Sequence, residues 1–380
     1  MTKSAESPLK DRVYWIDNAK AFGIIALFYG HVVEKIFLTY SSVAFLQYKL
    51  IYSFHIPLFF ILSGYVAKQP ESNIHSFIKD KFMSRFIPFV FFNIIILPGY
   101  LISDVIMHKE IELKQILVSS IFMIRGAPVF NPMTWFLVCL FSVELIHFFV
   151  SPYINNRNRL CFFMIIFYIL GWLISWKRSL IVGVLQLGDL WFVYEAIVAY
   201  SFYLFGKLLY TSNIGSRKFD SYLNILFLVL SAILLVSTFN LNQGPFLGEH
   251  PNNIVLIWTG TYGNIFFFPL TAIAGSLCFI ILSKLIGPNR LFEYLGRNSL
   301  ILMGLNGFYF QFINTFLVNQ GIKFISGSSL SIAILCGVLT FISLLLCIPF
   351  ILLLGKYLPQ LTGKPKVKGP ILPSFIHQES

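Results

Sequence analysis

The sequence predicts an all-α membrane protein, a bundle of about ten transmembrane helices with both termini on the cytoplasmic side. Hydrophobic residues make up 57% of the 380 residues and charged residues only 12%, whereas a soluble domain carries roughly 25% charged residues. Apolar runs long enough to cross a bilayer, about 17 to 25 residues, recur along the whole chain. Lys and Arg residues gather on alternate connections between these runs, as membrane topology requires.

Ten apolar runs define the expected spans, and an even number of spans returns the chain to the side where it began. They lie near residues 20–38, 50–67, 86–107, 134–150, 160–176, 190–210, 223–240, 262–283, 299–318 and 330–354. We therefore expect a cytoplasmic N-terminal segment over 1–19, one transmembrane domain over 20–355 and a cytoplasmic C-terminal tail over 356–380.

Basic residues set the orientation, because Lys and Arg are retained on the cytoplasmic side. The ten-span plan places 20 of the 28 Lys and Arg residues on the side of the N-terminus and 8 on the other. The basic residues stand singly between apolar runs and form no continuous basic stripe. We therefore attribute the net charge of +12 to membrane topology and expect no nucleic-acid partner. The five cysteines lack the spacing of metal ligands or disulfides. No metal site is expected.

The first span carries ionisable residues that a bilayer disfavours by about 2.5–3.5 kcal/mol each near its centre. Lys20 and His31 are eleven residues apart, close to three turns, so they share one face, with His31 about 16 Å deeper along the helix. Asp17 precedes Lys20 by three residues and can pair with it.

The second span enters from the outer side with His55 and continues inward past Ser63. Because the first two spans are antiparallel, His31 and His55 should occupy the same outer half of the membrane. A neutral imidazole is a suitable general base toward a hydroxyl group. Alternatively, each histidine caps a helix or bonds a backbone carbonyl.

Four further ionisable residues stand close to or within spans. Glu144 could orient an imidazole or bind a sugar hydroxyl, or its protonated carboxyl could bridge two helices, and the same holds for Glu195. Lys81 and Arg85 precede the third span, where they either anchor it on the cytoplasmic side or recognise the phosphates of an anionic cofactor.

The order of these motifs resembles that of the membrane proteins called acyltransferase family 3, particularly members similar to fucose 4-O-acetylase. The resemblance begins with RVYWIDNAKAFGIIALFYGH, which fits a basic residue, ten residues and a histidine through Lys20 and His31. FHIPLFFILSGY, KDKFMSRFIPF, TWFLVCLFSVE and YLGRNSLILM follow in family order between residues 54 and 303. One departure is that many members have a histidine shortly after the late Ser-Leu motif, whereas this chain has Asn306 in that neighbourhood.

The resemblance implies an O-acetyltransferase of the bacterial inner membrane. It would move an acetyl group from cytoplasmic acetyl-CoA, with no permanently bound cofactor, to an extracytoplasmic glycan such as O-antigen, capsule or exopolysaccharide. His31 would deprotonate the acceptor hydroxyl or carry the acetyl group itself, and Lys20 and Asp17 would belong to the catalytic group. The resemblance also suggests supporting roles for His55, Ser63 and Glu144 and donor-binding roles for Lys81 and Arg85.

A transporter that exports a lipid-linked sugar or a small metabolite is the alternative, because polar groups within ten spans also suit a translocation path. Such a protein more often shows two similar halves with Gly or Pro breaks at matching positions. The sequence shows no internal repeat of this kind, which favours the enzyme.

Overall fold

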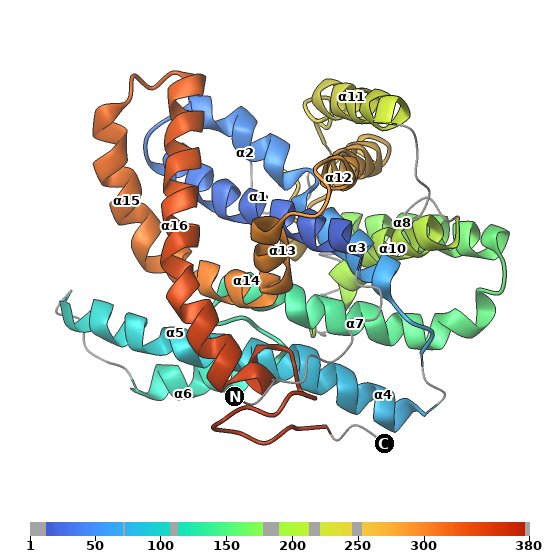
Figure 1. Ribbon diagram of the computed structural model, residues 1–380, viewed down its shortest axis with the longest axis horizontal. Helices are drawn as coiled ribbons and strands as arrows, with labels where there is room; N and C mark the ends of the chain where they lie inside the picture. Colours follow the sequence, from blue (N-terminus) through green and yellow to red (C-terminus); the bar gives the residue numbers. More distant parts are fainter. Residues whose placement is uncertain are drawn as a thin grey trace, which may run out of the picture.

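The protein is a bundle of helices, seen in a computed structural model that describes residues 13–70, 73–106, 113–177, 190–212, 221–244 and 253–376. Within these ranges the extended structure is limited to a β-bridge between Leu256 and Thr261. Figure 1 shows long helices crossing one another without a sheet. The all-α prediction is confirmed.

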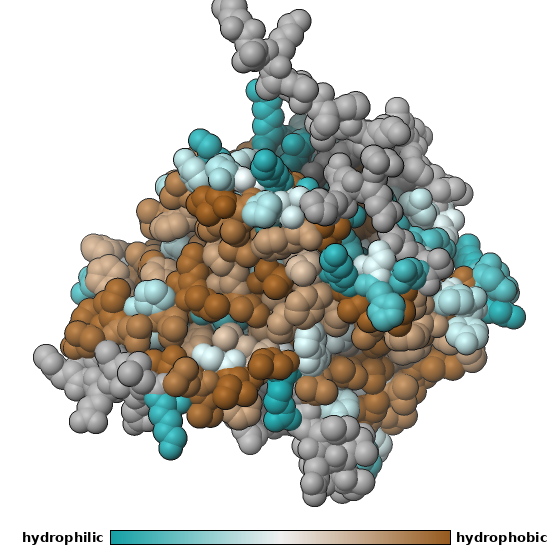
Figure 2. All heavy atoms as spheres, turned by 90° about the horizontal axis from the view of Figure 1, so that it is seen from below, coloured by the Kyte–Doolittle hydropathy of each residue, from teal (hydrophilic) through white to brown (hydrophobic). Residues whose placement is uncertain are grey.

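Eight helical stretches of the described chain are long and apolar enough to cross a membrane. They are Tyr14–Leu38, Ser42–Val66, Ile74–Ser103, Pro132–Tyr153, Arg157–Trp176, Phe267–Leu285, Ser299–Phe324 and Ser329–Tyr357. Large apolar side chains such as Phe227, Ile233 and Phe341 are exposed, and apolar residues dominate the face in Figure 2. Lipid accommodates such a surface and water does not. The chain is therefore a multi-pass membrane protein, while the count of ten spans stays a prediction.

Each of the ten expected spans coincides with a helical stretch. The second is broken at Ser53 and Phe54, and the ninth consists of two α-helices joined by a π-helical turn. The corresponding helices are α1 (Tyr14–Thr39), α2 (Phe45–Tyr52) with α3 (His55–Val66), α5 (Ile87–Ile106), α7 (Trp135–Val150), α8 (Arg157–Trp176), α10 (Val193–Thr211), α11 (Ser221–Thr238), α12 (Phe267–Leu285), α14 (Ser299–Phe308) with α15 (Asn314–Gly321), and α16 (Ser329–Tyr357).

Shorter helices fill the connections: α4 (Ile74–Lys81), α6 (Leu113–Phe122) and α13 (Arg290–Arg297). Helix α1 lies at the centre and packs against α3, α12, α13, α14 and α16. Glycine permits a close crossing of α3 and α10, since a Cβ at Gly64 of α3 would lie only 1.9 Å from the carbonyl oxygen of Tyr203 in α10. The bundle is thus built around the helix that carries Lys20 and His31.

A π-helical turn, η2 (Phe82–Phe86), joins α4 to α5. Pro88 follows it, and a proline ring clashes with the carbonyl of the residue four positions earlier, here Ser84. Widening the helix by one residue relieves this clash and leaves that carbonyl free to accept from Nη1 of Arg85 at 3.4 Å. A second π-helical turn, η7 (Tyr309–Ile313), joins α14 to α15. Single π turns often occur at functional sites.

The C-terminal segment is not a plain polar tail. After α16, a short 3-10 helix, η9 (Pro359–Thr362), packs against α5 and η2. Its Gln360 is fully buried. In Figure 1 the segment runs back beside the ends of α4 and α5. The sequence gives little indication of this, because four prolines and several lysines are equally typical of a solvated tail.

Candidate active site

A cavity of about 870 Å³ opens between the helices. One face of α1 forms a wall, with lining residues three or four positions apart: Lys20, Ile24, Leu27, His31, Glu34 and Leu38. This spacing follows one side of an α-helix. The prediction that Lys20 and His31 share a face is confirmed, and both side chains border the same space.

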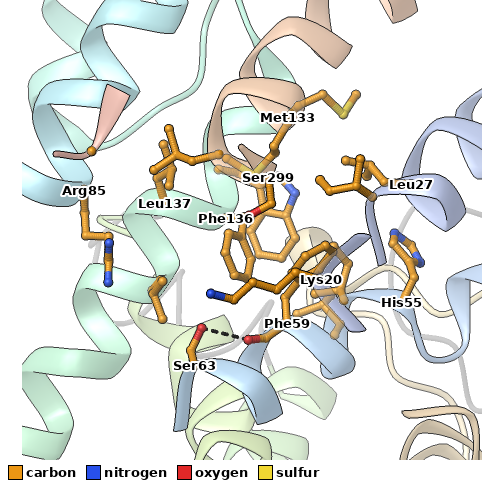
Figure 3. Close-up of a pocket in the computed structure, with 18 of the residues that line it drawn as sticks. Lys20, Leu27, His55, Phe59, Ser63, Arg85, Met133, Phe136, Leu137 and Ser299 are labelled. Carbon is orange, nitrogen blue, oxygen red and sulfur yellow. Dashed lines mark hydrogen bonds between the residues drawn. The ribbon is translucent and has the colours of Figure 1, made fainter. Parts of the chain in front are cut away.

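Most of the other predicted site residues also line this cavity. His55 and Ser63 reach it from α3, Lys81 from α4, Arg85 from η2 and Glu144 from α7. Figure 3 shows Lys20 extending toward the centre, between Ser63 and Phe136, with Arg85 at the edge. Asp17 and Glu195 are buried but are not lining residues.

His31 is 5% exposed, and its ring is held by the residue that departs from the family pattern. Its Nδ1 lies 2.5 Å from Oδ1 of Asn306 in α14. An amide oxygen only accepts hydrogen bonds, so Nδ1 carries the proton and Nε2 keeps the lone pair. The ring also packs against Phe310 of η7, with centroids 5.0 Å apart. Asn306 therefore selects the tautomer in which Nε2 is the base.

The side chains of His55 and Ser63 each donate a hydrogen bond to the backbone carbonyl of the residue four positions earlier. Nδ1 of His55 donates to the carbonyl of Ile51 at 2.8 Å, and Oγ of Ser63 donates to the carbonyl of Phe59 at 2.8 Å. The backbone-bonded alternative for His55 is therefore what the structure shows. The ring of Tyr52 neighbours both imidazoles, with its centroid 6.2 Å from that of His31 and 4.9 Å from that of His55.

Glu144 pairs with Lys81 and Arg85, the two cations that precede the third expected span. Its Oε1 accepts from Nζ of Lys81 at 2.9 Å and from Nη2 of Arg85 at 3.0 Å, and its Oε2 accepts from Nε of Arg85 at 3.1 Å. The side chain of Glu144 is 8% exposed and those of its partners 24% and 23%. Two cations and one carboxylate leave a net positive charge that faces the cavity.

Asp17 connects the first and the late sequence motifs. Its Oδ2 lies 3.5 Å from Nε of Arg297 at the end of α13. The two segments can approach closely because Gly296 has no side chain. A Cβ there would be 1.9 Å from the carbonyl oxygen of Asp17. Arg297 itself lines the cavity. A role of Asp17 in holding Lys20 stays a prediction.

Sequence reasoning missed the opposite end of the cavity. Glu34 is one turn beyond His31, and its Oε2 accepts from the hydroxyl of Tyr52 at 2.7 Å. Trp258, 43% exposed, also lines the cavity, from the segment after residue 253. Glu34 could have been found, since it is an ionisable residue within a span and on the face of His31. Trp258 could not have been found, because it lies in a connection between spans, where no helical periodicity relates one residue to the next.

A buried amide network fixes α14 in place. Nδ2 of Asn131 donates to the carbonyl of Gly304 at 2.9 Å and to that of Phe92 at 3.1 Å. Oδ1 of Asn93 accepts from the backbone of Asn131 at 2.9 Å. Buried amides satisfied in this way rigidify their surroundings, and α14 is the helix that presents Asn306 to His31.

In the described part of the chain, no group of three His, Cys, Asp or Glu side chains is placed to hold a metal ion. Comparison with known proteins finds one relationship. The family model described as an acyltransferase domain matches residues 13–352. No curated protein and no solved structure matches the chain.

Proposed function

This chain belongs to the acyltransferase family, and we propose that it transfers an acetyl group from cytoplasmic acetyl-CoA to a sugar hydroxyl of a bacterial surface polysaccharide. Membership makes it a membrane acyltransferase. The donor, the sugar acceptor and the bacterial inner membrane belong to the proposal.

The observation that carries the proposal is one cavity whose lining includes cations, a carboxylate, an indole and a histidine. Along α1, Lys20 lies on one side of His31 and Glu34 on the other, and Lys81, Arg85 and Trp258 line the same cavity from other elements. Lys and Arg suit the phosphates of coenzyme A. Glu34 and Trp258 suit a glycan. A carboxylate accepts hydrogen bonds from sugar hydroxyl groups, and the face of an indole ring packs against sugar C–H groups. His31 lines the same cavity and can serve both substrates.

The reaction follows from the tautomer of His31. Nε2 takes the proton of the acceptor hydroxyl while the hydroxyl oxygen attacks the thioester carbonyl. The new O–C bond forms, the C–S bond breaks, and coenzyme A leaves as a thiolate that regains the proton from the imidazolium. Lys20 places its positive charge near the oxygen that becomes negative during attack.

A covalent relay uses the same lone pair. Nε2 would attack the thioester, release coenzyme A and hold the acetyl group until the sugar hydroxyl removes it. Incubation of purified protein with radiolabelled acetyl-CoA, without acceptor, separates the routes. Acetyl label retained on His31 indicates the relay, and its absence in a protein that transfers acetyl groups indicates direct attack.

Proton NMR of the purified surface polysaccharide tests the function. A deletion strain carries the wild-type gene, His31→Ala or His75→Ala, the last being an exposed histidine of α4 that does not line the cavity. We expect O-acetyl signals from the wild type and His75→Ala and none from His31→Ala, at equal protein levels in the membrane.

Two results would count against the proposal. Polysaccharide that is made and exported with the same O-acetyl content in every strain, including the deletion, would remove the glycan acceptor. Polysaccharide that fails to reach the surface in the deletion strain would favour the transporter. Near-normal acetylation by His31→Ala would retain the function and refute the role of the histidine.

A further inference from the structure

The segment after α16, residues 359–376, forms an ordered edge of the cavity that we call the C-terminal lip. It lies beyond the residues matched by the family, 13–352. Hydrogen bonds within the lip fold it back on itself: Nε2 of Gln360 donates to the carbonyl of Leu372 at 2.6 Å, and the amide of Phe375 donates to the carbonyl of Pro365 at 2.8 Å. The lip is thus a built part of the structure.

The lip is attached to the same turn that carries Arg85. Gly363 has φ of +85°, a left-handed conformation that favours glycine. A Cβ there would be 2.6 Å from Cδ1 of Leu300 and 3.5 Å from the carbonyl oxygen of Ser84 in η2. Nζ of Lys366 lies 3.5 Å from Oδ1 of Asp80 in α4. These contacts fix the lip against the third span.

The attachment directs basic residues of the lip to the mouth of the cavity. Thr362, Gly363, Lys364 and Lys366 are lining residues. Lys68 and Arg297 line the cavity from other elements, so that its lining holds seven Lys and Arg residues against three Asp and Glu. Lys366 keeps half of its side chain exposed. The mouth therefore offers accessible cations to a ligand that carries several negative charges.

We propose that Lys364 and Lys366 of the C-terminal lip bind the phosphates at the nucleotide end of the acyl-CoA donor. The inference rests on the proposed function, which supplies a thioester to be held near His31. Arg85 and Lys20 line the same cavity and are more buried than Lys364 and Lys366, so the thioester end of the donor would extend past them while its charged nucleotide stays at the more exposed lysines. Part of the expected cytoplasmic C-terminal tail, 356–380, would then belong to the donor site.

Titration calorimetry with full-length protein in neutral detergent tests this directly, with acetyl-CoA as the probe. Lys364→Ala/Lys366→Ala should raise the Kd for acetyl-CoA about tenfold, as expected for two partly exposed charge pairs. Lys356→Ala/Lys368→Ala is the matched control, because it removes the same charge from two exposed residues that do not line the cavity. Its Kd should equal that of the wild type.

Steady-state kinetics supply a second measurement. The lip variant should raise KM for acetyl-CoA and leave kcat unchanged, because contacts far from the thioester are equally strong in ground and transition states. Lys364→Glu/Lys366→Glu should raise KM further. A loss of kcat with unchanged KM would identify the lip as structural and overturn the proposal.

Two other outcomes also decide against it. If the lip variant binds acetyl-CoA as tightly as the wild type and loses only its stabilisation by phosphatidylglycerol, the lysines contact lipid phosphates instead. If the wild type does not bind acetyl-CoA at all, acetyl-CoA is not the donor and the proposal for the lip is refuted as well. The titration of the wild-type protein alone reveals this outcome.

Discussion

Nδ1 of His31 in α1 lies 2.5 Å from the amide oxygen of Asn306 in α14, although the two residues are 275 positions apart. Both side chains are buried. A buried imidazole without this acceptor would have to leave its N–H unpaired or rotate away. Asn306 thus sets both the tautomer and the direction of the ring.

Replacing Asn306 by a residue of similar size tests this positioning role. Asn306→Leu should lower kcat by about ten- to a hundredfold, since an unpaired buried donor costs roughly 1–3 kcal/mol. Asn306→Asp keeps an oxygen opposite Nδ1 and should retain most of the activity. Acetyl transfer measured at saturating donor and acceptor distinguishes the two. Equal loss in both variants would contradict the assignment.

Lys20 should act in the reaction and not only at the membrane interface, because its side chain extends into the cavity. Lys20→Ala should reduce transfer by about ten- to a hundredfold, the loss typical of a hydrogen bond to a charged group, and Lys20→Arg should restore part of it. Lys79→Ala is the control, an exposed lysine of α4 that does not line the cavity. If both alanine variants behave alike, Lys20 is only an anchor.

Glu144 should stabilise the bundle by neutralising Lys81 and Arg85. Glu144→Gln leaves two partly buried cations without a counterion, which costs about 3 kcal/mol when one partner of a buried pair is lost. We expect a lower Tm in detergent. Arg85→Ala/Glu144→Ala should be less destabilised than the sum of the single variants, because the two side chains share hydrogen bonds. Additive effects would show that the pair contributes little.

Trp258 should contribute to the acceptor and not to the donor. Trp258→Ala should raise KM for the glycan about three- to tenfold, in line with roughly 0.5–1.5 kcal/mol for an aromatic contact, and leave KM for acetyl-CoA unchanged. Trp176→Ala is the matched control, since Trp176 is 45% exposed against 43% for Trp258 and does not line the cavity. A change in KM for acetyl-CoA alone would place Trp258 on the donor side.

Periodicity within single helices allowed part of the site to be predicted. Lys20 and His31 lie on one face because eleven residues make about three turns, whatever surrounds the helix. The same rule extends to Glu34, which the sequence analysis overlooked although it lies on this face. His55, Ser63, Lys81, Arg85 and Glu144 were also expected near the site, and all line the cavity.

The sequence by itself determined that the chain is a bundle of apolar helices and which face of the first helix is polar, because composition and helical period are local properties. Only the tertiary structure decided that Asn306 holds His31, that Asp17 pairs with Arg297, that Glu144 joins Lys81 and Arg85, and that residues 359–376 return to the cavity. These partners meet across tens to hundreds of residues. These contacts depend on the angles and distances at which helices pack. Shape complementarity at sites such as Gly64 and Gly296 determines that packing.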